Sequence, residues 1–496
     1  MKMQFKSTRN QDNIVTASQA IIQGLATDGG LYVPTEWPSI DLDWSELKEM
    51  TYQELAYFVM SIFFDDFSEA DLKSCIDGAY DEKFDTDVIA PLAKVGEDYY
   101  LELFHGPTIA FKDLALQILP HLMKKSAEMN ANNKEIAILT ATSGDTGKAA
   151  MAGFADVPST KIIVFYPQGG VSTIQEKQMV TQKGDNTFVV AIEGNFDDAQ
   201  TEVKRLFNDE ALRADLAAEN IQFSSANSMN IGRLIPQVVY YFYAYAQLVK
   251  HEEIEAGSPV NFVVPTGNFG DILAGYYAQK LGLPVGKLVC ASNDNTVLYD
   301  FFNTGVYDKN REFKLTISPS MDILVSSNFE RMLFHALGDD VAQLSALMND
   351  LDEKGRYEFP ADLSEKFASF LGEFADEDQT KAEIDRVYQE YDYLMDPHTG
   401  VASASLQKLK AKDALNGPSV VVSTASPYKF PQAVLTAIGQ DVENATDDEL
   451  VANIKSAGNR DYPNAIKEIQ TAEVRHNRVS TVGDMKATVV GILTGE

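Results

Sequence analysis

One lysine stands out in this chain because of the residues around it. Lys112 lies in the segment Phe104–Asp113, which reads FHGPTIAFKD and consists mostly of apolar and small residues. A lysine in such surroundings is costly to keep charged, since desolvation disfavours the ammonium form and lowers its pKa. An amine of that kind is suited to form a Schiff base with a carbonyl compound. The alternative is a lysine at a helix start whose long side chain reaches water.

Three other segments share one architecture, in which a loop follows the carboxyl end of an expected strand. They are Leu139–Gly147 (LTATSGDTG), Val264–Asp271 (VPTGNFGD) and Val422–Pro427 (VSTASP). Ligands of open α/β sheets bind at such strand ends. Glycine lets the backbone approach a ligand closely, and free N–H groups at a helix start favour an anion. We therefore expect each of the first two loops to be able to hold a phosphate or a carboxylate, although either alone is also an ordinary strand–helix turn.

Neither glycine loop matches a nucleotide-binding motif. Gly144–Lys148 reads GDTGK, which is one glycine short of a P-loop, and Ala149 follows in place of Ser or Thr. Gly267–Gly270 reads GNFG and not GxGxxG. Together with Lys112 the loops instead indicate a pyridoxal phosphate site, where the cofactor brings the electron sink and the protein supplies position and electrostatics.

The parts of this expected site differ in the chemistry that they offer. The cofactor phosphate would take N–H donors from one turn and the helix after it, made of Gly267, Asn268, Phe269, Gly270 and Asp271. Thr424 would offer its hydroxyl to the pyridine nitrogen. The carboxylate of an amino-acid substrate would meet the other glycine loop, made of Thr142, Ser143, Gly144, Asp145 and Thr146. For Asp145, a turn-forming role is the alternative.

The motifs resemble those of the threonine synthase family. Glu102–Leu116 is similar to the pyridoxal-phosphate attachment signature of the fold type II serine/threonine dehydratase group, in the variant typical of threonine synthases. The motifs TSGDTG (142–147), NSMNIGR (227–233) and PTGNFGD (265–271) also resemble that family, as do Ser7–Arg9 and Asp28–Pro34 of an opening module that dehydratases lack. The resemblance spans roughly residues 5–440 and is greatest to the longer class of fungi and many bacteria. One departure is Ser426-Pro427, where family members often have His-Pro.

The expected fold is α/β, with doubly wound and mostly parallel sheets, because strand and helix patterns alternate along the chain. Segments typical of buried strands are 135–141, 161–166, 187–192, 260–264, 287–291 and 419–423. The resemblance implies the fold type II architecture, which is similar to the tryptophan synthase β subunit. We expect an N-terminal module at residues 1–95, a cofactor-lysine domain at 96–255 and a large domain at 256–496 with a helical insertion at about 339–395. Thr51–Glu54 is typical of a capping box at a helix start.

The resemblance also implies an activity. Threonine synthases are pyridoxal-phosphate-dependent carbon–oxygen lyases that act on a phosphate ester. They convert O-phospho-L-homoserine and water to L-threonine and phosphate, the last step of threonine biosynthesis, by γ-elimination and β-addition. Lys112 would hold the cofactor and then serve as general base. Candidates for the substrate phosphate are Asn227, Ser228, Asn230 and Arg233, where a polar loop enters a long helix. The alternative for Arg233 is a helix-start arginine in a salt bridge.

Three other functions remain open from the residues alone. A dehydratase or cysteine synthase shares the fold, but the N-terminal module and the PTGNFGD loop argue against it. A phospho-lyase that releases 2-oxobutyrate from the same substrate is barely excluded by sequence, because the position of one water decides the product. The third alternative is a non-catalytic ligand-binding protein or scaffold, and Lys112 argues against it because such a protein needs no buried amine.

Composition limits the partners of the chain. Its 496 residues include 73 acidic and 41 basic ones, for a formal net charge of −32. Such a surface repels phosphate backbones and anionic lipid, so we expect neither nucleic acid nor membrane as a partner. The two cysteines form no disulfide framework, the six histidines lack zinc-site spacing and no signal peptide or membrane span is evident. We expect a cytoplasmic enzyme without a metal, as a monomer or homodimer.

Overall fold

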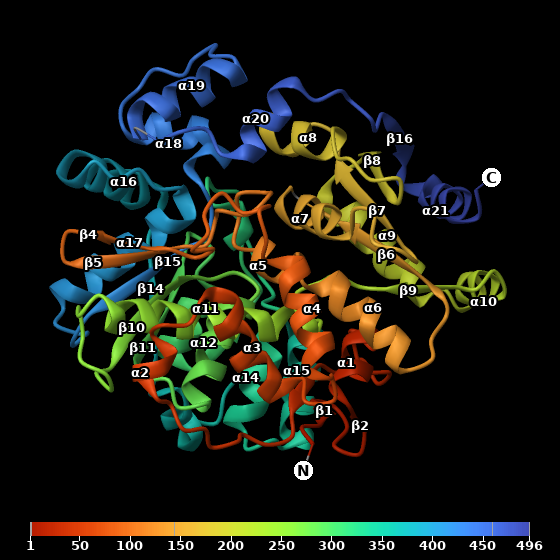
Figure 1. Ribbon diagram of the computed structural model, residues 1–496, viewed down its shortest axis with the longest axis horizontal. Coiled ribbons are helices and arrows are strands. Elements are labelled where there is room, and N and C mark those ends of the chain that lie inside the picture. The colour runs from red at the N-terminus through yellow and green to blue at the C-terminus, as the bar shows by residue number, and fades with distance from the viewer. Residues whose placement is uncertain (1, 143, 459, 496) are drawn as a thin grey trace.

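Two β-sheets, one mostly and one wholly parallel, lie side by side, and helices cover both faces of each (Figure 1). The structure, a computed structural model, describes residues 2–142, 144–458 and 460–495. The larger sheet occupies the left half of the view in Figure 1 and the smaller sheet the right half. The short helix α5 (Asp113–Leu116), which begins directly after Lys112, lies between them.

The larger sheet has six strands, and all neighbours are parallel except β4 and β5. Their order is β14 (Phe370–Phe374), β11 (Val285–Ser292), β10 (Val260–Pro265), β15 (Ser419–Ser423), β5 (Asp98–Glu102) and β4 (Leu92–Val95). Alternate residues of a strand serve two cores, as the strand period requires. Phe262 and Val264 pack with α11 (Ile231–Lys250) and α12 (Gly270–Lys280), while Val263 packs with α16 (Glu377–Tyr391) and α17 (Pro397–Ala411).

The smaller sheet has five strands, all parallel. Their order is β16 (Arg478–Thr481), β8 (Thr187–Glu193), β7 (Thr160–Pro167), β6 (Glu135–Ala141) and β9 (Ile221–Ser224). One face packs on α6 (Leu119–Met129) and α7 (Asp145–Phe154), and the other on α9 (Phe196–Asn208), α10 (Glu210–Ala218) and α21 (Met485–Thr494). The same alternation is seen here, since Ile162 and Ile163 belong to different cores.

The remaining elements lie around these sheets. The N-terminal module has a small antiparallel sheet, β1 (Phe5–Ser7), β2 (Ile14–Val15) and β3 (Tyr32–Pro34), with α1 (Ala17–Gln23), α2 (Trp44–Leu47), α3 (Tyr52–Phe63) and α4 (Glu69–Ala79). A second antiparallel pair is β12 (Val306–Asp308) and β13 (Arg356–Glu358). The other helices are α8 (Thr173–Val180), α13 (Val297–Thr304), α14 (Phe329–Ala336), α15 (Val341–Lys354), α18 (Pro431–Ala437), α19 (Asp447–Gly458) and α20 (Asn464–Thr471). Short 3-10 helices are η1 (Pro319–Met321), η2 (Ala361–Phe367), η3 (Pro427–Lys429) and η4 (Val482–Asp484).

The doubly wound, mostly parallel α/β fold is confirmed, but the segment expected to be a helical insertion is not purely helical. Besides α15 and α16 it contains β13 and β14, and β14 pairs with β11 at the edge of the larger sheet. Its sequence, FLGEF, holds a glycine and a glutamate, which hide the strand signal. Phe370 nevertheless packs against Phe302 in a stacked geometry, with ring centroids 5.4 Å apart.

Strand pairings also span the expected boundaries at residues 95 and 255, and β4 pairs with β5 across the first of them. β5 precedes Lys112 in the chain yet pairs with β15 of the larger sheet. β16, from residues 478–481, pairs with β8 of the smaller sheet. The chain therefore enters and leaves each sheet more than once, which local sequence patterns do not encode.

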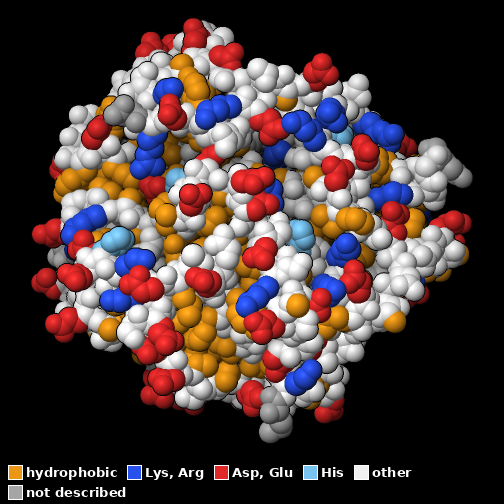
Figure 2. All heavy atoms as spheres, viewed as in Figure 1, with side chains coloured by type: hydrophobic (Ala, Val, Ile, Leu, Met, Phe, Trp, Pro, Cys, Tyr) orange, Lys and Arg blue, Asp and Glu red, His pale blue; other side chains and the backbone are white. Residues whose placement is uncertain are grey.

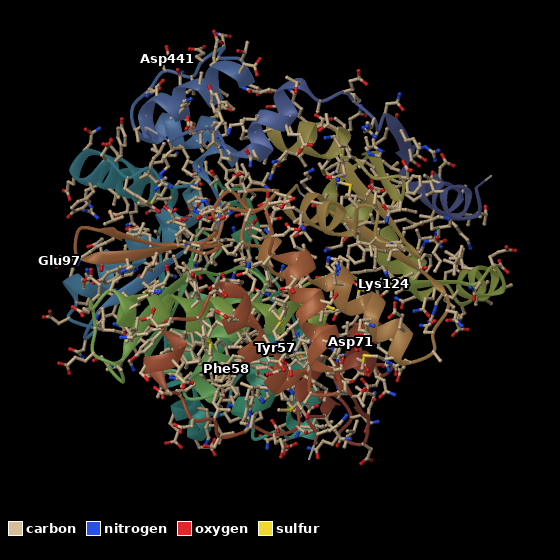
Figure 3. All side chains as sticks on the ribbon, viewed as in Figure 1. Tyr57, Phe58, Asp71, Glu97, Lys124 and Asp441 are labelled. Carbon is tan, nitrogen blue, oxygen red and sulfur yellow. The ribbon has the colours of Figure 1, made fainter. Side chains whose placement is uncertain are left out.

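Acidic residues outnumber basic ones in this chain, 73 to 41. On the face drawn in Figure 2, acidic side chains are spread around the outline and do not gather in one patch. Glu97, at the turn between β4 and β5, and Asp441, before α19, lie at the periphery of the molecule (Figure 3). Within the described ranges, no helix combines the length and hydropathy that crossing a lipid bilayer requires.

Candidate active site

Lys112 lies at the end of a loop that is fastened to the strand end of β15. The Phe111 N–H donates to the Thr424 carbonyl at 2.8 Å, and the Ser426 N–H donates to the Ile109 carbonyl at 3.1 Å. Ile109 has a φ of 53°. The backbone on either side of Thr424 thus fixes the loop that carries Lys112, and the expected pairing of these two segments in space is seen.

Asp113 holds the same loop from the inside. Its carboxylate accepts from the Thr108 N–H at 2.8 Å and from the Thr108 hydroxyl at 2.6 Å. Burial raises the pKa of Asp113 to about 6, although these hydrogen bonds oppose the shift. Gly106 permits this packing, because a Cβ placed there would lie 2.6 Å from Asp113 side-chain atoms.

The amine of Lys112 is enclosed. The residue is 8% exposed, and its Nζ lies 3.1 Å from Ser320 Oγ and 3.4 Å from Asp145 Oδ2. Burial lowers the pKa of Lys112, Asp145 opposes this, and the charges of Lys429 and Arg233 lower it further. The side chain does not reach bulk water, so the alternative of an exposed helix-start lysine is wrong.

Asp145 is the first residue of α7 and has partners on both carboxylate oxygens. Lys429 Nζ lies 3.2 Å from its Oδ1, and Gln175 Nε2 donates to the same oxygen at 2.7 Å. Burial alone would raise the pKa of Asp145, but Lys429 and Lys112 lower it well below its usual range. Asp145 is therefore an ionised carboxylate inside the site and not only a turn-forming residue.

The loop before α7 also caps its own helix. The Thr142 hydroxyl accepts from the N–H groups of Gly144 and Gly147, at 3.0 Å each. Gly144 has a φ of 134°, which disfavours any residue with a side chain. The Thr142 hydroxyl keeps one proton to donate. Thr146 is half-buried, and Ser143 lies outside the described residues.

The GNFG turn lies against the loop of Ser320. A Cβ placed on Gly267 would lie 2.4 Å from the Ser320 carbonyl oxygen, so only glycine fits this contact. The Asn268 carbonyl accepts from the Asn328 N–H at 3.1 Å, and the Asn268 side chain is exposed. Since Ser320 Oγ also contacts Lys112 Nζ, one residue spans the distance between the amine and the turn.

The helix that follows the turn begins without a side-chain cap. Phe269, in the left-handed region with a φ of 64°, precedes Gly270, the first residue of α12, and among the described residues no side chain caps the helix. Asp271 is buried and accepts from the hydroxyls of Tyr240 and Tyr241, at 2.6 and 2.8 Å. Burial raises the pKa of Asp271 to about 6.

The segment before α11 approaches the same turn. The closest atoms to a Cβ placed on Gly270 include the Ser228 Cβ, at 4.0 Å. Asn227 is exposed and accepts from the Ser228 N–H at 2.6 Å. Asn230 caps α11 by accepting from the Gly232 N–H at 2.9 Å, and it donates to the Ile21 carbonyl at 3.0 Å. The Asn230 side chain thus links the N-terminal module to the loop.

Arg233 is a buried cation. It is 5% exposed, and its Nη1 donates to the Ala226 carbonyl at 3.0 Å. Burial lowers the pKa of Arg233 to about 10. Among the described residues no carboxylate lies within ion-pair distance of it, so the alternative of a structural salt bridge is wrong. A buried guanidinium without a carboxylate partner is suited to bind an anionic ligand.

The sequence interpretation missed Lys429, Ser320 and Gln175. Lys429 follows Thr424 by five residues in the apolar run Pro427–Pro431, so the argument used for Lys112 would have found it. Ser320 and Gln175 are common polar residues in loops and helices, and no signal in the sequence marks them.

Comparison with family models matches three parts of the chain. Residues 4–80 match the model described as threonine synthase N terminus, residues 89–348 match pyridoxal-phosphate dependent enzyme, and residues 399–489 match threonine synthase, C-terminal. The second model alone covers more than half of the chain.

Several known proteins are similar over most of this chain. Threonine synthase from Saccharomyces cerevisiae is 37% identical, over 88% of this chain and 89% of the yeast protein. The enzyme from Pseudomonas aeruginosa is 39% identical, over 88% and 91%. Threonine synthase-like 1 from Homo sapiens is 41% identical over 85% of this chain, which spans only 58% of that relative's length. The crystal structure of pyridoxal-phosphate-bound threonine synthase from Brucella melitensis is 35% identical, covers 99% of each chain and has a TM-score of 0.88.

Proposed function

Because this chain belongs to the threonine synthase family of pyridoxal-phosphate-dependent enzymes, we propose that it converts O-phospho-L-homoserine and water to L-threonine and phosphate. The observation that carries the proposal is the convergence on Ser320. Its hydroxyl lies 3.1 Å from Lys112 Nζ, and its carbonyl lies against Gly267. A buried amine and a glycine turn at a helix start are thereby held in one site.

The residues present fit pyridoxal phosphate. Lys112 offers an amine whose pKa is lowered by burial, as a lysine that binds an aldehyde requires. The uncapped start of α12 offers N–H groups to the cofactor phosphate, and we assign Gly267, Asn268, Phe269, Gly270 and Asp271 to that part. Thr424, at the end of β15, is assigned to the pyridine nitrogen. When bound, the cofactor supplies an electron sink for negative charge on the carbon atoms of the amino acid.

Lys112 is the proposed general base. Its Nζ would take the proton from Cα of the substrate, and the same amine would return protons to neighbouring carbons. The balance of the reaction is the loss of phosphate from Cγ, which ends as a methyl group, and the gain of a hydroxyl from water at Cβ. The neutral Thr424 hydroxyl, in contrast to a carboxylate, holds the pyridine nitrogen less firmly protonated.

The two charged ends of the substrate are assigned to different loops. Arg233, with Asn227, Ser228 and Asn230, is proposed to meet the phosphate. Its burial and the proximity of Ser228 to Gly270 support this assignment. Thr142, Ser143, Gly144, Asp145 and Thr146 are proposed to form the loop that surrounds the substrate carboxylate. Asp145, which is itself ionised, would orient the donors of this loop and not contact that carboxylate. The proton that the Thr142 hydroxyl keeps can be donated to that group.

A product assay tests the proposal. The full chain with pyridoxal phosphate is given O-phospho-L-homoserine, and threonine, phosphate and 2-oxobutyrate are followed together. Equal amounts of threonine and phosphate are expected. Release of 2-oxobutyrate with phosphate would instead identify a phospho-lyase, and turnover of threonine itself would identify a dehydratase.

We further propose that the enzyme acts in the cytoplasm, without nucleic acid, as a monomer or homodimer. Both cysteines, Cys75 and Cys290, are free and buried, which suits a reducing compartment. The net charge of −32 disfavours contact with phosphate backbones. Light scattering with size-exclusion chromatography measures the oligomeric state.

A further inference from the structure

Asp145 faces two buried amines at once. Its Oδ2 lies 3.4 Å from Lys112 Nζ, and its Oδ1 lies 3.2 Å from Lys429 Nζ. Two further donors are neutral: Gln175 Nε2 donates to Oδ1 at 2.7 Å, and the Ser320 hydroxyl donates to Oδ2 at 3.3 Å. A single carboxylate balances one positive charge, so the two amines compete for it.

The contacts of the two amines are not equivalent. Lys429 is 0% exposed, and its Nζ also donates to the Thr108 carbonyl at 2.8 Å. A carbonyl and a carboxylate accept hydrogen bonds but cannot donate, which suits a fully protonated ammonium. Lys112 has the longer contact to Asp145 and donates to the Ser320 hydroxyl at 3.1 Å, while that hydroxyl donates its own proton to Asp145 Oδ2 at 3.3 Å. A neutral amine still has N–H groups for both of these contacts, whereas Lys429 has only acceptors around it.

We propose that Lys429 is a fixed cation that balances Asp145 and so leaves Lys112 as the neutral amine that the chemistry at this site requires. This inference rests on the function proposed above and adds a residue to it. Lys429 acts through Asp145 and on Lys112, and is therefore a positioning residue. Its second contact, to Thr108, holds it against the loop that ends at Lys112.

The charged groups around Lys112 come from several elements. Asp145 belongs to α7, Lys429 to η3 and Arg233 to α11. After burial, which is the largest cause, Lys429 and Arg233 lower the pKa of Lys112, and Asp145 raises it. Behind Ser320 lies a further pair, since the Ser320 N–H donates to His398 Nε2 at 3.1 Å and His398 Nδ1 lies 2.6 Å from Asp396. Removing the charge of Lys429 leaves Asp145 to act on Lys112 alone.

The protonation of Lys112 can be measured without turnover. The cofactor-free full chain is treated with trace acetic anhydride over a range of pH, and acetylation of Lys112 is quantified by peptide mass spectrometry. Only the neutral amine reacts. The pH at which acetylation of Lys112 is half-maximal is the midpoint. In Lys429→Gln, whose amide can still donate to the Thr108 carbonyl, this midpoint is expected to rise by about one pH unit or more, which means about tenfold less neutral amine at a fixed pH.

Lys148→Gln is the matched control. Lys148 lies on α7 less than one turn beyond Asp145, but its Nζ bonds to Gln182 and not to Asp145. Its replacement is expected to leave the midpoint of Lys112 nearly unchanged. A shift as large as that of Lys429→Gln would show that any nearby charge acts alike, and would overturn the specific role of Lys429.

The double variant Asp145→Asn/Lys429→Gln completes the test. It removes one negative and one positive charge together, so the midpoint is expected to return close to that of the unaltered chain. A folded Lys429→Gln protein with an unchanged midpoint would overturn the proposal. If Lys429→Gln does not fold, the double variant is compared with Asp145→Asn instead. An equal Lys112 midpoint in these two proteins would overturn the proposal. None of these readings depends on which product the enzyme makes.

Discussion

The loop before α7 and the turn before α12 both place a Gly-Asp pair at a helix start, yet they differ in what they leave for a ligand. The helix α7 is capped by its own loop, because the Thr142 hydroxyl accepts from the Gly147 N–H at 3.0 Å. The helix α12 has no side-chain cap from the part of the chain that the structure describes, and Phe269 adopts a φ of 64° before it. Of two loops that look alike in sequence, the second has the helix start that is better suited to a phosphate.

The aspartates of the two loops differ as well. Asp145 faces Lys112 and Lys429, and these cations lower its pKa far enough to outweigh burial. Asp271 faces the hydroxyls of Tyr240 and Tyr241, so burial prevails and its pKa rises to about 6. The comparison teaches that the partners supplied by distant elements, and not the local motif, decide whether such an aspartate carries a charge.

The largest expected effect concerns Lys112, the amine that faces Asp145 at the start of α7, and tests whether this amine is the reactive group. Lys112→Ala is expected to lower threonine formation by at least about a thousandfold, because the amine that serves as base is lost. Threonine and phosphate release are measured together, with circular dichroism to show that the fold is kept. Lys161→Ala, which removes a half-buried lysine of β7 that pairs with Glu135, is the control. Appreciable residual turnover in Lys112→Ala would rule out the assigned role.

The second effect addresses the charge of Asp145. Asp145→Asn leaves Lys429 buried without its carboxylate, and breaking a buried ion pair in this way costs about 3–5 kcal/mol. The thermal midpoint at pH 7.5 is therefore expected to fall by several degrees. An unchanged midpoint would mean that the ammonium of Lys429 is stabilised by the Thr108 carbonyl alone.

The third effect concerns Asp271, whose replacement is expected to stabilise the protein, in contrast to that of Asp145. Its pKa is about 6 in the folded state and about 3.9 in an unfolded chain, so the folded state gains stability as the pH falls from about 6 to about 4 and lacks this gain above pH 6. Asp271→Asn removes this ionisation. It is expected to stabilise the protein by up to about 3 kcal/mol at pH 8 and by little at pH 4. Thermal midpoints at both pH values measure this, and a lower midpoint at pH 8 would show that Asp271 is charged and favourably paired.

Many of the strands and helix starts that position the two loops could be predicted from the sequence. The strands expected at residues 135–141 and 419–423 have the same bounds in the structure, as β6 and β15. The capping box of Thr51 and Glu54 is also present at the start of α3. These features depend on short runs of apolar residues and on contacts three residues apart, which local physics determines.

What decides the chemistry was less visible. Lys429 reaches Asp145, and Ser320 reaches Lys112, from more than 170 residues away in the chain. β16 likewise joins the smaller sheet from a distant part of the sequence, by pairing with β8. Pairings of this kind depend on how complete elements pack, and a residue type alone does not indicate them. The opposite environments of Asp145 and Asp271 belong to this class.

The smallest expected effect concerns Arg233, whose charge acts on Lys112 and whose loop lies beside the α12 turn. Arg233→Ala is expected to raise the Michaelis constant for O-phospho-L-homoserine by about tenfold or more, because a charge-assisted hydrogen bond is worth about 1.5–3 kcal/mol. Steady-state kinetics measure this, with Arg386→Ala as the control, since Arg386 pairs with Glu383 and Glu390 on α16. If only the maximal rate changed, Arg233 would act on the amine of Lys112 and not hold the substrate phosphate in the ground state. The anion of the substrate would then have to be bound by the α12 turn or the α7 loop, and the division of labour between the two loops would need to be redrawn.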